Sequence, residues 1–287
     1  MALNLVSFGE VLFDVLPTGE HLGGAPLNLA VHARHLGAQS AIVTRLGRDD
    51  RGERAAATVR AHGVCGAAIQ WDDALPTGTA VADMQPDGSA VFTISQPAAW
   101  DAIDGPQAVA ALADFGPVDA LCFGTLSLRG DSRQGLAALC DALRPRYRFL
   151  DINLRAPFYG EAVIRACCER ANLLKINDIE AGLLGPMLYG RELAEAELAE
   201  ALLRQYGFEA IIVTRGEKGC AGYAPGRALE LPGIQVQVID TVGSGDAFSA
   251  AFLTAYCQGA DLEEALRAGN RRGAAVAAMA GALPPTA

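Results

Sequence analysis

Short apolar runs of strand length recur along the chain, and most are followed by segments in which apolar residues return every three or four positions. The first pattern is typical of strands and the second of helices packed by one face. Their regular alternation predicts a mostly parallel sheet covered by helices on both faces. We expect strands over residues 3–8, 11–16, 41–46, 118–123, 148–152, 172–176, 210–214 and 234–238, and helices starting near residues 26, 50 and 246 or spanning 132–143, 161–170 and 192–206.

The pattern changes over residues 66–96, where short alternating pieces replace helical periodicity. Two such pieces, Thr79 to Met84 and Ser89 to Ile94, flank Asp87-Gly88, a strong signal for a hairpin turn. These residues predict a small antiparallel flap inserted into the alternating chain. The whole chain, residues 1–287, is expected to form one α/β domain, with flap (lid) strands drawn from about 10–20 and 66–97.

The stretch of residues 240–248 joins the last expected strand to a helix that should begin at about Asp246. Its turn leaves the backbone N–H groups of Gly243, Ser244 and Gly245 free to face one point, and a helix N-terminus attracts anions such as a phosphoryl group. Asp246 by itself could equally be a helix N-cap. The glycines and a second acid at the start of the stretch favour a base beside an anion site, which transfer of phosphate to a hydroxyl requires.

Composition narrows the functional classes. The 287 residues are 51% hydrophobic and 20% charged, with a net charge of −10 and a pI of about 4.9. Such an acidic chain is a poor binder of nucleic acid or of an anionic membrane surface, and no apolar run approaches the ~18 residues that a membrane span needs. Seven cysteines without a C-x-x-C pair indicate reduced thiols, and no signal peptide is seen, so we expect a cytoplasmic protein.

Two other phosphate-binding motifs do not fit. The Walker A loop needs a lysine after glycine, whereas Lys175 and Lys218, the only lysines, follow leucine and glutamate. The dinucleotide fingerprint needs three glycines, or two and an alanine, and Phe248 stands at the third position after Gly243 and Gly245. A nicotinamide enzyme is therefore not expected.

Two motifs match a known family. They are GGAPLNLA at residues 23–30 and DTVGSGDAF at residues 240–248, and TGTA at 77–80 and KINDIE at 175–180 agree with them. With these motifs the chain resembles the ribokinase-like (PfkB) carbohydrate kinases, nearly from end to end. Within that family, FGEVLFDVLP at 8–17 and DINLR at 151–155 look most like bacterial fructokinases.

The resemblance implies a role for each part of the turn. Asp246 would be the general base that takes the proton of a sugar hydroxyl as it attacks the γ-phosphate of ATP. The N–H groups of Gly243, Ser244 and Gly245 would stabilise charge on the transferred group. Ser244 stands where the family more often has alanine, which leaves the backbone N–H in place. The residues implied to hold the sugar are Asp14, Gly24 and Asn28.

The resemblance also implies a nucleotide and metal site. Glu180 would order the Mg²⁺–phosphate region through water, because Mg²⁺ keeps several waters and needs few protein ligands. Asp240 would supply a carboxylate to a monovalent cation such as K⁺. The other ligands would be backbone carbonyls near residues 242, 276, 279 and 281. The residues implied to bind ATP are Asn177, Thr214, Gly216, Gly219, Gly245 and Asn270.

Three readings of the function stay open. The first is an ATP-dependent sugar kinase, with fructose as the expected sugar. The second is a kinase for another sugar, such as ribose or 2-keto-3-deoxygluconate, or for a nucleoside. The third is a non-catalytic regulator that binds a sugar or nucleotide, against which the intact glycine turn and Asp246 argue. We also expect a homodimer formed through the lid, because an exposed edge strand invites pairing.

Overall fold

The larger of two sheets organises the molecule. The computed structural model describes residues 3–84 and 90–286, and within them this sheet has nine strands in the order β13-β12-β11-β10-β9-β8-β1-β4-β5. Neighbouring strands from β5 to β11 run parallel, while β12 and β13 are antiparallel at one edge. The predicted mostly parallel sheet is therefore confirmed. Its strands are β1 Asn4–Phe8, β4 Gln39–Gly47, β5 Ile69–Asp72, β8 Ala120–Phe123, β9 Tyr147–Asp151, β10 Leu173–Asn177, β11 Ala210–Thr214, β12 Cys220–Ala224 and β13 Arg227–Leu231.

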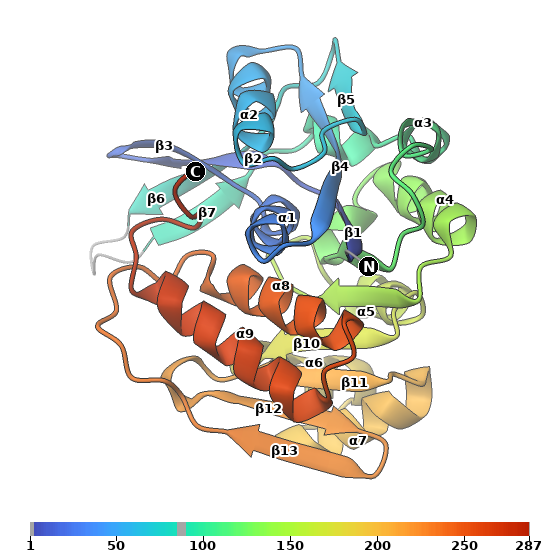
Figure 1. The fold of residues 1–287 in the computed structure, drawn as a ribbon, viewed down its shortest axis with the longest axis vertical. Coiled ribbons are helices and arrows are strands. Elements are labelled where there is room, and N and C mark those ends of the chain that lie inside the picture. Colours follow the sequence, from blue (N-terminus) through green and yellow to red (C-terminus); the bar gives the residue numbers. More distant parts are fainter. Residues whose placement is uncertain (1–2, 85–89, 287) are drawn as a thin grey trace.

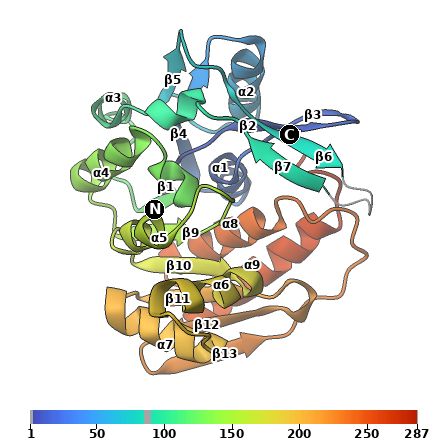
Figure 2. The ribbon, with the colours of Figure 1, turned by 180° about the vertical axis from the view of Figure 1, so that it is seen from behind.

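Helices cover both faces of this sheet, as the alternation predicts. Figure 1 looks onto the layer formed by α1, α8 and α9, and Figure 2 shows α4, α5, α6 and α7 on the opposite face. Each layer has its own buried apolar cluster; Phe252 and Leu266 belong to the first, and Leu136 and Leu202 to the second. The helices are α1 Ala25–His35, α2 Asp50–Ala61, α3 Gly105–Ala111, α4 Ser132–Leu143, α5 Glu161–Cys168, α6 Asp178–Tyr189, α7 Glu195–Tyr206, α8 Ser244–Cys257 and α9 Leu262–Ala277.

The smaller sheet is the lid, with strand order β3-β2-β6-β7 (Figure 1). Strand β2 runs parallel to β6, and the outer pairs are antiparallel. The expected flap thus exists, but its extent differs from the prediction. The predicted Asp87-Gly88 turn lies outside the described residues. The lid strands are β2 Leu12–Leu16, β3 Gly19–Gly23, β6 Gly78–Met84 and β7 Ala90–Ile94.

Two sequence-based expectations are wrong. Residues 66–77 do not belong to the lid, because β5 pairs in parallel with β4 and forms an edge of the main sheet. Residues 234–238 alternate apolar and polar but form no strand. They are exposed, with Ile234 41% and Val238 58% accessible, and the next backbone hydrogen bond is made by Ile239, whose N–H donates to Ala277 O at 2.9 Å.

Parallel strands bring several polar groups to one edge. The carboxyl ends of β1, β9 and β10 carry Glu10, Asp151 and Asn177, and the N-termini of α1 and α8 reach the same edge. Ligands of open α/β sheets bind at this edge. Among the described residues, none of the helices combines the length and apolarity needed to span a bilayer.

Candidate active site

The glycine turn opens α8 and exposes backbone donors. Gly243 is the N-cap with φ of 75°, a left-handed conformation that favours glycine. A Cβ there would lie 2.6 Å from Ala282 Cβ, so the turn is also packed too closely for a side chain. The N–H groups of Gly245 and Asp246 make no hydrogen bond to any residue in the described ranges. They are free to bind an anion, to which the helix N-terminus adds a partial positive charge.

The structure changes two details of the predicted turn. The Ser244 N–H, expected to face the anion, donates to Thr241 O at 3.2 Å and closes the turn. Asp246 is not an N-cap, because the helix begins at Ser244 and Asp246 is its third residue. Its carboxylate is therefore not used for capping and accepts a side-chain hydrogen bond instead.

That bond joins the two predicted sites. Asn28 Nδ2 of α1 donates to Asp246 Oδ2 at 2.7 Å, although the residues are 218 positions apart. Helices α1 and α8 pack side by side, which places the predicted sugar residue against the predicted base (Figure 1). Burial raises the pKa of Asp246 to about 6, and the nearby Asp151 carboxylate raises it further, whereas the Asn28 bond lowers it. A carboxylate with this pKa is ionised at neutral pH and is a stronger base than an exposed aspartate.

A buried ion pair lies beneath the turn. Lys175 Nζ contacts Asp151 Oδ1 at 3.0 Å and Oδ2 at 3.1 Å, and Ser249 Oγ donates to Asp151 Oδ2 at 2.8 Å. A Cβ on Gly245 would lie 3.2 Å from Lys175 Nζ, so the ammonium supports the anion site from behind. Burial alone would lower the pKa of Lys175, but the carboxylates of Asp151, Glu180 and Asp246 raise it. Lys175 therefore stays charged.

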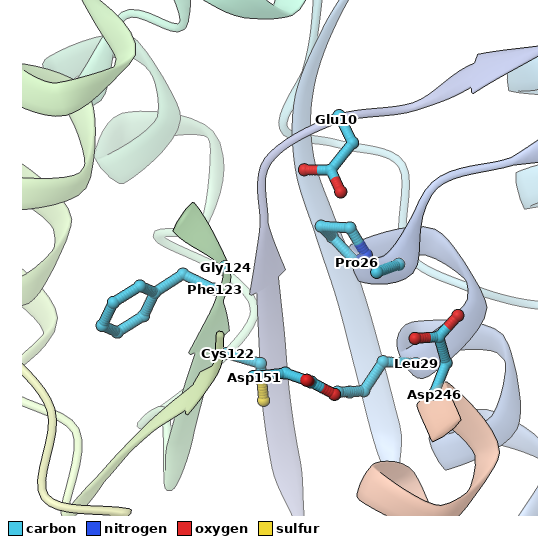
Figure 3. Close-up of a pocket in the computed structure, with 9 residues that line it drawn as sticks. Glu10, Pro26, Leu29, Cys122, Phe123, Gly124, Asp151 and Asp246 are labelled. Carbon is cyan, nitrogen blue, oxygen red and sulfur yellow. The ribbon is translucent and has the colours of Figure 1, made fainter. Parts of the chain in front are cut away.

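Glu10 is a second unusual carboxyl at this edge. It is 3% exposed, and its Oε2 has no hydrogen-bond partner among the described residues. Burial raises the pKa of Glu10 to about 7, with a further contribution from the Asp246 carboxylate. Glu10, Asp151 and Asp246 surround a cavity of about 20 Å³, which is about the space of one water molecule (Figure 3). These acids come from three elements far apart in the sequence.

The N-terminus of α1 is built tightly against Glu10. Gly24 is the N-cap with φ of 113°, and a Cβ there would lie 2.4 Å from Glu10 O. No side chain fits this position, and Pro26 suits the first helical turn that follows. The need for glycine at position 24 is thus explained by packing, and its role in sugar binding stays a prediction.

Asp14 is an acid of the lid. It lies on β2, opposite His21 of β3. Burial raises the pKa of Asp14, and the positive charge of Arg155 lowers it. Arg155 likewise lowers the pKa of Glu10 and of Asp246, so its exposed guanidinium lies close to three acids. Within the described chain Arg155 forms no ion pair.

Several predicted nucleotide residues have structural partners. Asn177 caps α6, and the Glu180 carboxylate accepts from Asn177 N and Leu154 N, both at 2.8 Å. Asn270 Nδ2 donates to Pro232 O at 2.8 Å and thereby ties the exposed segment before the turn to α9. Each Glu180 oxygen keeps a lone pair that can accept a further hydrogen bond from water. Their roles toward a nucleotide stay predictions.

The other predicted residues lie on the same side of the sheet. Thr214 ends β11, and its hydroxyl donates to Ile176 O at 3.4 Å. Gly216 has φ of 55° with open space around it, whereas a Cβ on Gly219 would lie 2.1 Å from Leu231 O. Asp240 accepts from Val242 N at 3.0 Å and Gly281 N at 3.1 Å, and so joins the turn to the chain after α9.

Sequence reasoning missed the roles of Glu10, Lys175 and Arg155. Glu10 lies two residues after the end of β1, and Lys175 interrupts an otherwise apolar strand; both patterns are visible in the sequence. Neither pattern reveals that both side chains lie close enough to Asp246 to interact with its charge. That proximity depends on how distant parts of the chain pack together.

Comparisons with known proteins agree with this geometry. A model of the pfkB family carbohydrate kinases matches residues 3–287. Fructokinase-2 of Solanum lycopersicum is 30% identical, covering 99% of this chain and 93% of the relative, and Fructokinase-1 of rice, Oryza sativa subsp. japonica, is 29% identical over 98% of this chain and 93% of its own length. A fructokinase from Xylella fastidiosa, solved with bound ATP, has the same fold, with a TM-score of 0.85, 22% identity, and coverage of 98% of this chain and 95% of that one.

Proposed function

The chain belongs to the pfkB family of carbohydrate kinases and is a sugar kinase, and we propose that its substrate is fructose and that Asp246 is its base. The observation that carries the role of Asp246 is its place beside the free N–H group of Gly245, with a raised pKa of about 6. Fructose is supported by the full-length similarity to plant fructokinases.

In the proposed reaction the Asp246 carboxylate accepts the proton of a sugar hydroxyl. The hydroxyl oxygen forms a bond to the γ-phosphorus of ATP, the bond from that phosphorus to the bridging oxygen breaks, and ADP leaves with the electron pair. The N–H groups of Gly245 and Asp246 bind the oxygens of the transferred group, and the Lys175 charge adds to that field. Asn28 keeps the base oriented through its 2.7 Å bond.

The sugar would lie between the lid and the start of α1. Asp14 and Gly24 are available there for hydroxyls, and Asn28 can use its Oδ1, which is buried without a partner among the described residues. A polyol can donate to that oxygen and accept from neighbouring amides. We propose that Arg155 neutralises the phosphates and the surrounding acids when ATP is bound.

The proposed cofactor is ATP with Mg²⁺, which supplies neutralisation of phosphate charge. The donor set fits an indirect role for Glu180, because each of its oxygens already accepts a backbone N–H group and Mg²⁺ usually keeps several of its waters. ATP would contact Asn177, Thr214, Gly216, Gly219 and Asn270. We propose that Asp240 and nearby carbonyls hold K⁺; unchanged rates with tetramethylammonium in place of K⁺ would contradict this.

We propose that two copies pair through the lid. Strands β6 and β7 carry three apolar side chains with an unusually high exposed fraction. These are Val81 at 47%, Val91 at 55% and Phe92 at 45%. Light scattering should give the mass of a dimer, and Phe92→Asp should give a monomer. A wild-type monomer at working concentration would end this proposal. We also propose a cytoplasmic location, because all seven cysteines are free thiols.

An ADP-release assay tests the function with a panel of fructose, ribose, 2-keto-3-deoxygluconate and a nucleoside. We expect fructose to give the highest kcat/KM. A higher value for another member would replace fructose and leave the base assignment intact. Tight ATP binding without turnover of any sugar would favour the regulator and contradict the proposal.

A further inference from the structure

A second cavity lies among residues that follow α1 and residues of α8 and α9, away from the glycine turn. It is a groove of about 400 Å³ beside the second half of α8, lined by Thr254 and Gln258 of that region and by Arg271 and Arg272 of α9. The remaining lining is apolar and includes Leu36 and Ala255. No acidic side chain lines it, although the chain carries a net charge of −10.

The two arginines of this groove have no acidic partner among the described residues. Neither Arg271 nor Arg272 forms an ion pair within the described chain. Arg272 Nε and Thr254 Oγ1 are buried without a hydrogen-bond partner among the described residues, and Thr254 is 5% exposed. Burial lowers the pKa of Arg272, as expected of a cation without a counter-charge. Leaving such donors unpaired is costly, so native structures usually explain them by a missing partner.

We propose that this groove is a binding site for a phosphate group, free or carried on a small carbon skeleton. The guanidinium groups of Arg271 and Arg272 offer donors to several phosphate oxygens at once, and arginine suits this geometry better than lysine. The volume exceeds that of a bare phosphate, and the apolar walls would accept the carbon skeleton. The site is distinct from the glycine turn.

The groove is connected to the catalytic turn. Arg272 Nη2 donates to His32 Nδ1 at 3.0 Å, and His32 Nε2 donates to Ala282 O at 2.9 Å. Burial lowers the pKa of His32 to about 4, so the ring is neutral and its one proton can lie on Nε2. Ala282 packs against Gly243, where no Cβ would fit. A phosphate that draws Arg272 toward the groove would loosen this support of the turn, and the bound anion would therefore inhibit turnover.

Isothermal titration calorimetry tests the site without relying on turnover. Inorganic phosphate and glycerol 3-phosphate are the two probes, and sodium chloride at matched ionic strength is the control. Arg271→Gln should weaken binding of both about tenfold. Arg267→Gln, an exposed arginine of the same helix that does not line the groove, should change binding less than twofold.

Tighter binding of glycerol 3-phosphate would identify a phosphate ester as the ligand, and equal binding would identify free phosphate; both support the site. The absence of binding, or equal binding by all variants, would overturn it. Because Arg271 is exposed, the Arg271→Gln variant should fold, which thermal melting checks. In turnover assays, inhibition by phosphate should weaken in Arg271→Gln by the same factor; binding without inhibition would refute the connection to the turn.

Discussion

The hydrogen bond between Asn28 and Asp246 should set the lower pH limit of activity. Asp246 must be ionised to accept a proton, and its pKa of about 6 predicts that kcat/KM falls as the pH drops through 6. Asn28 Nδ2 donates to the ionised carboxylate at 2.7 Å and favours that form. Replacing Asn28 by leucine removes the donor and keeps a similar volume. The pKa of Asp246 should therefore rise.

The size of the rise follows from the bond. A hydrogen bond to a charged group contributes about 1.5 to 3 kcal/mol, and 1.36 kcal/mol corresponds to one pKa unit. Asp246 is only half-buried, so water replaces part of the lost bond, and we use the lower figure. The acid limb of the Asn28→Leu variant should thus lie about one pH unit above that of the wild-type enzyme.

The assay measures initial rates of ADP release from pH 5 to 9 at saturating ATP, with the sugar varied so that kcat and KM separate. The loss of a sugar contact would lower kcat/KM by the same factor at every pH, whereas the loss of the donor to the base moves the acid limb of kcat/KM to higher pH. Asn4→Leu is the matched control. Asn4 lies at the start of β1, away from the site at the other end of that strand, and its Nδ2 donates to Pro117 O. An acid limb at unchanged or lower pH in Asn28→Leu would refute the reasoning.

Three further variants test other parts of the site. The pKa of Glu10 is about 7 in the folded protein against an ordinary 4.5, so the stability of the wild-type protein should fall as the pH rises through this window. In urea titrations Glu10→Gln should be up to about 3 kcal/mol more stable than wild type at pH 8 and equally stable at pH 4.5. Equal stability of the two proteins at pH 8 would contradict this. Lys175→Met should lower the free energy of unfolding by about 3 to 5 kcal/mol, because it leaves the Asp151 charge buried without a partner. Adding Asp151→Asn should restore most of that stability in thermal melts. A double variant as unstable as the single one would contradict the pairing. Gly243→Ala should lower turnover at least tenfold, because the new Cβ would lie 2.6 Å from Ala282 Cβ. Gly190 also has a positive φ but lies in open space, so Gly190→Ala should lose stability and keep its turnover. Equal turnover of the two variants would contradict the steric argument.

Local periodicity predicts most of the fold, because each element buries one face against a common sheet. The helix over residues 132–143 and the strand over 210–214 agree with the structure residue for residue. The failures occur where periodicity has another cause. Residues 234–238 alternate like a strand but have no neighbouring strand to pair with, and β5 resembles a lid strand although its partner is β4. Pairing between distant segments is not encoded in a local pattern.

Helix α6 shows a different failure. It is not among the helices expected from the sequence, and Gly182, Gly185 and Pro186 interrupt the apolar periodicity of its residues. Asn177 and Glu180 form a capping box at the start of this helix. From the sequence, the same two residues are predicted to act at the nucleotide and its Mg²⁺. The sequence shows that these residues are special, and only the structure shows that capping accounts for their bonds.

The candidate site is predictable where the chain itself places the groups together. The glycine turn and Asp246 are adjacent in sequence, and their geometry follows from the start of a helix. The approach of Asn28, Lys175 and Glu10 to Asp246 depends on how α1, β10 and the end of β1 pack around α8. These side chains are separated by 70 residues or more from Asp246 along the chain, so spacing carries no signal of their contact.

The most direct test of the proposed chemistry is Asp246→Asn, which keeps the shape of the side chain and removes the base. Binding of ATP and of the sugar, measured by calorimetry, should stay within about threefold of wild type, while kcat falls about 10³-fold or more. A variant that binds both ligands and retains most of its kcat would show that another group takes the proton, and the account of this site would be wrong.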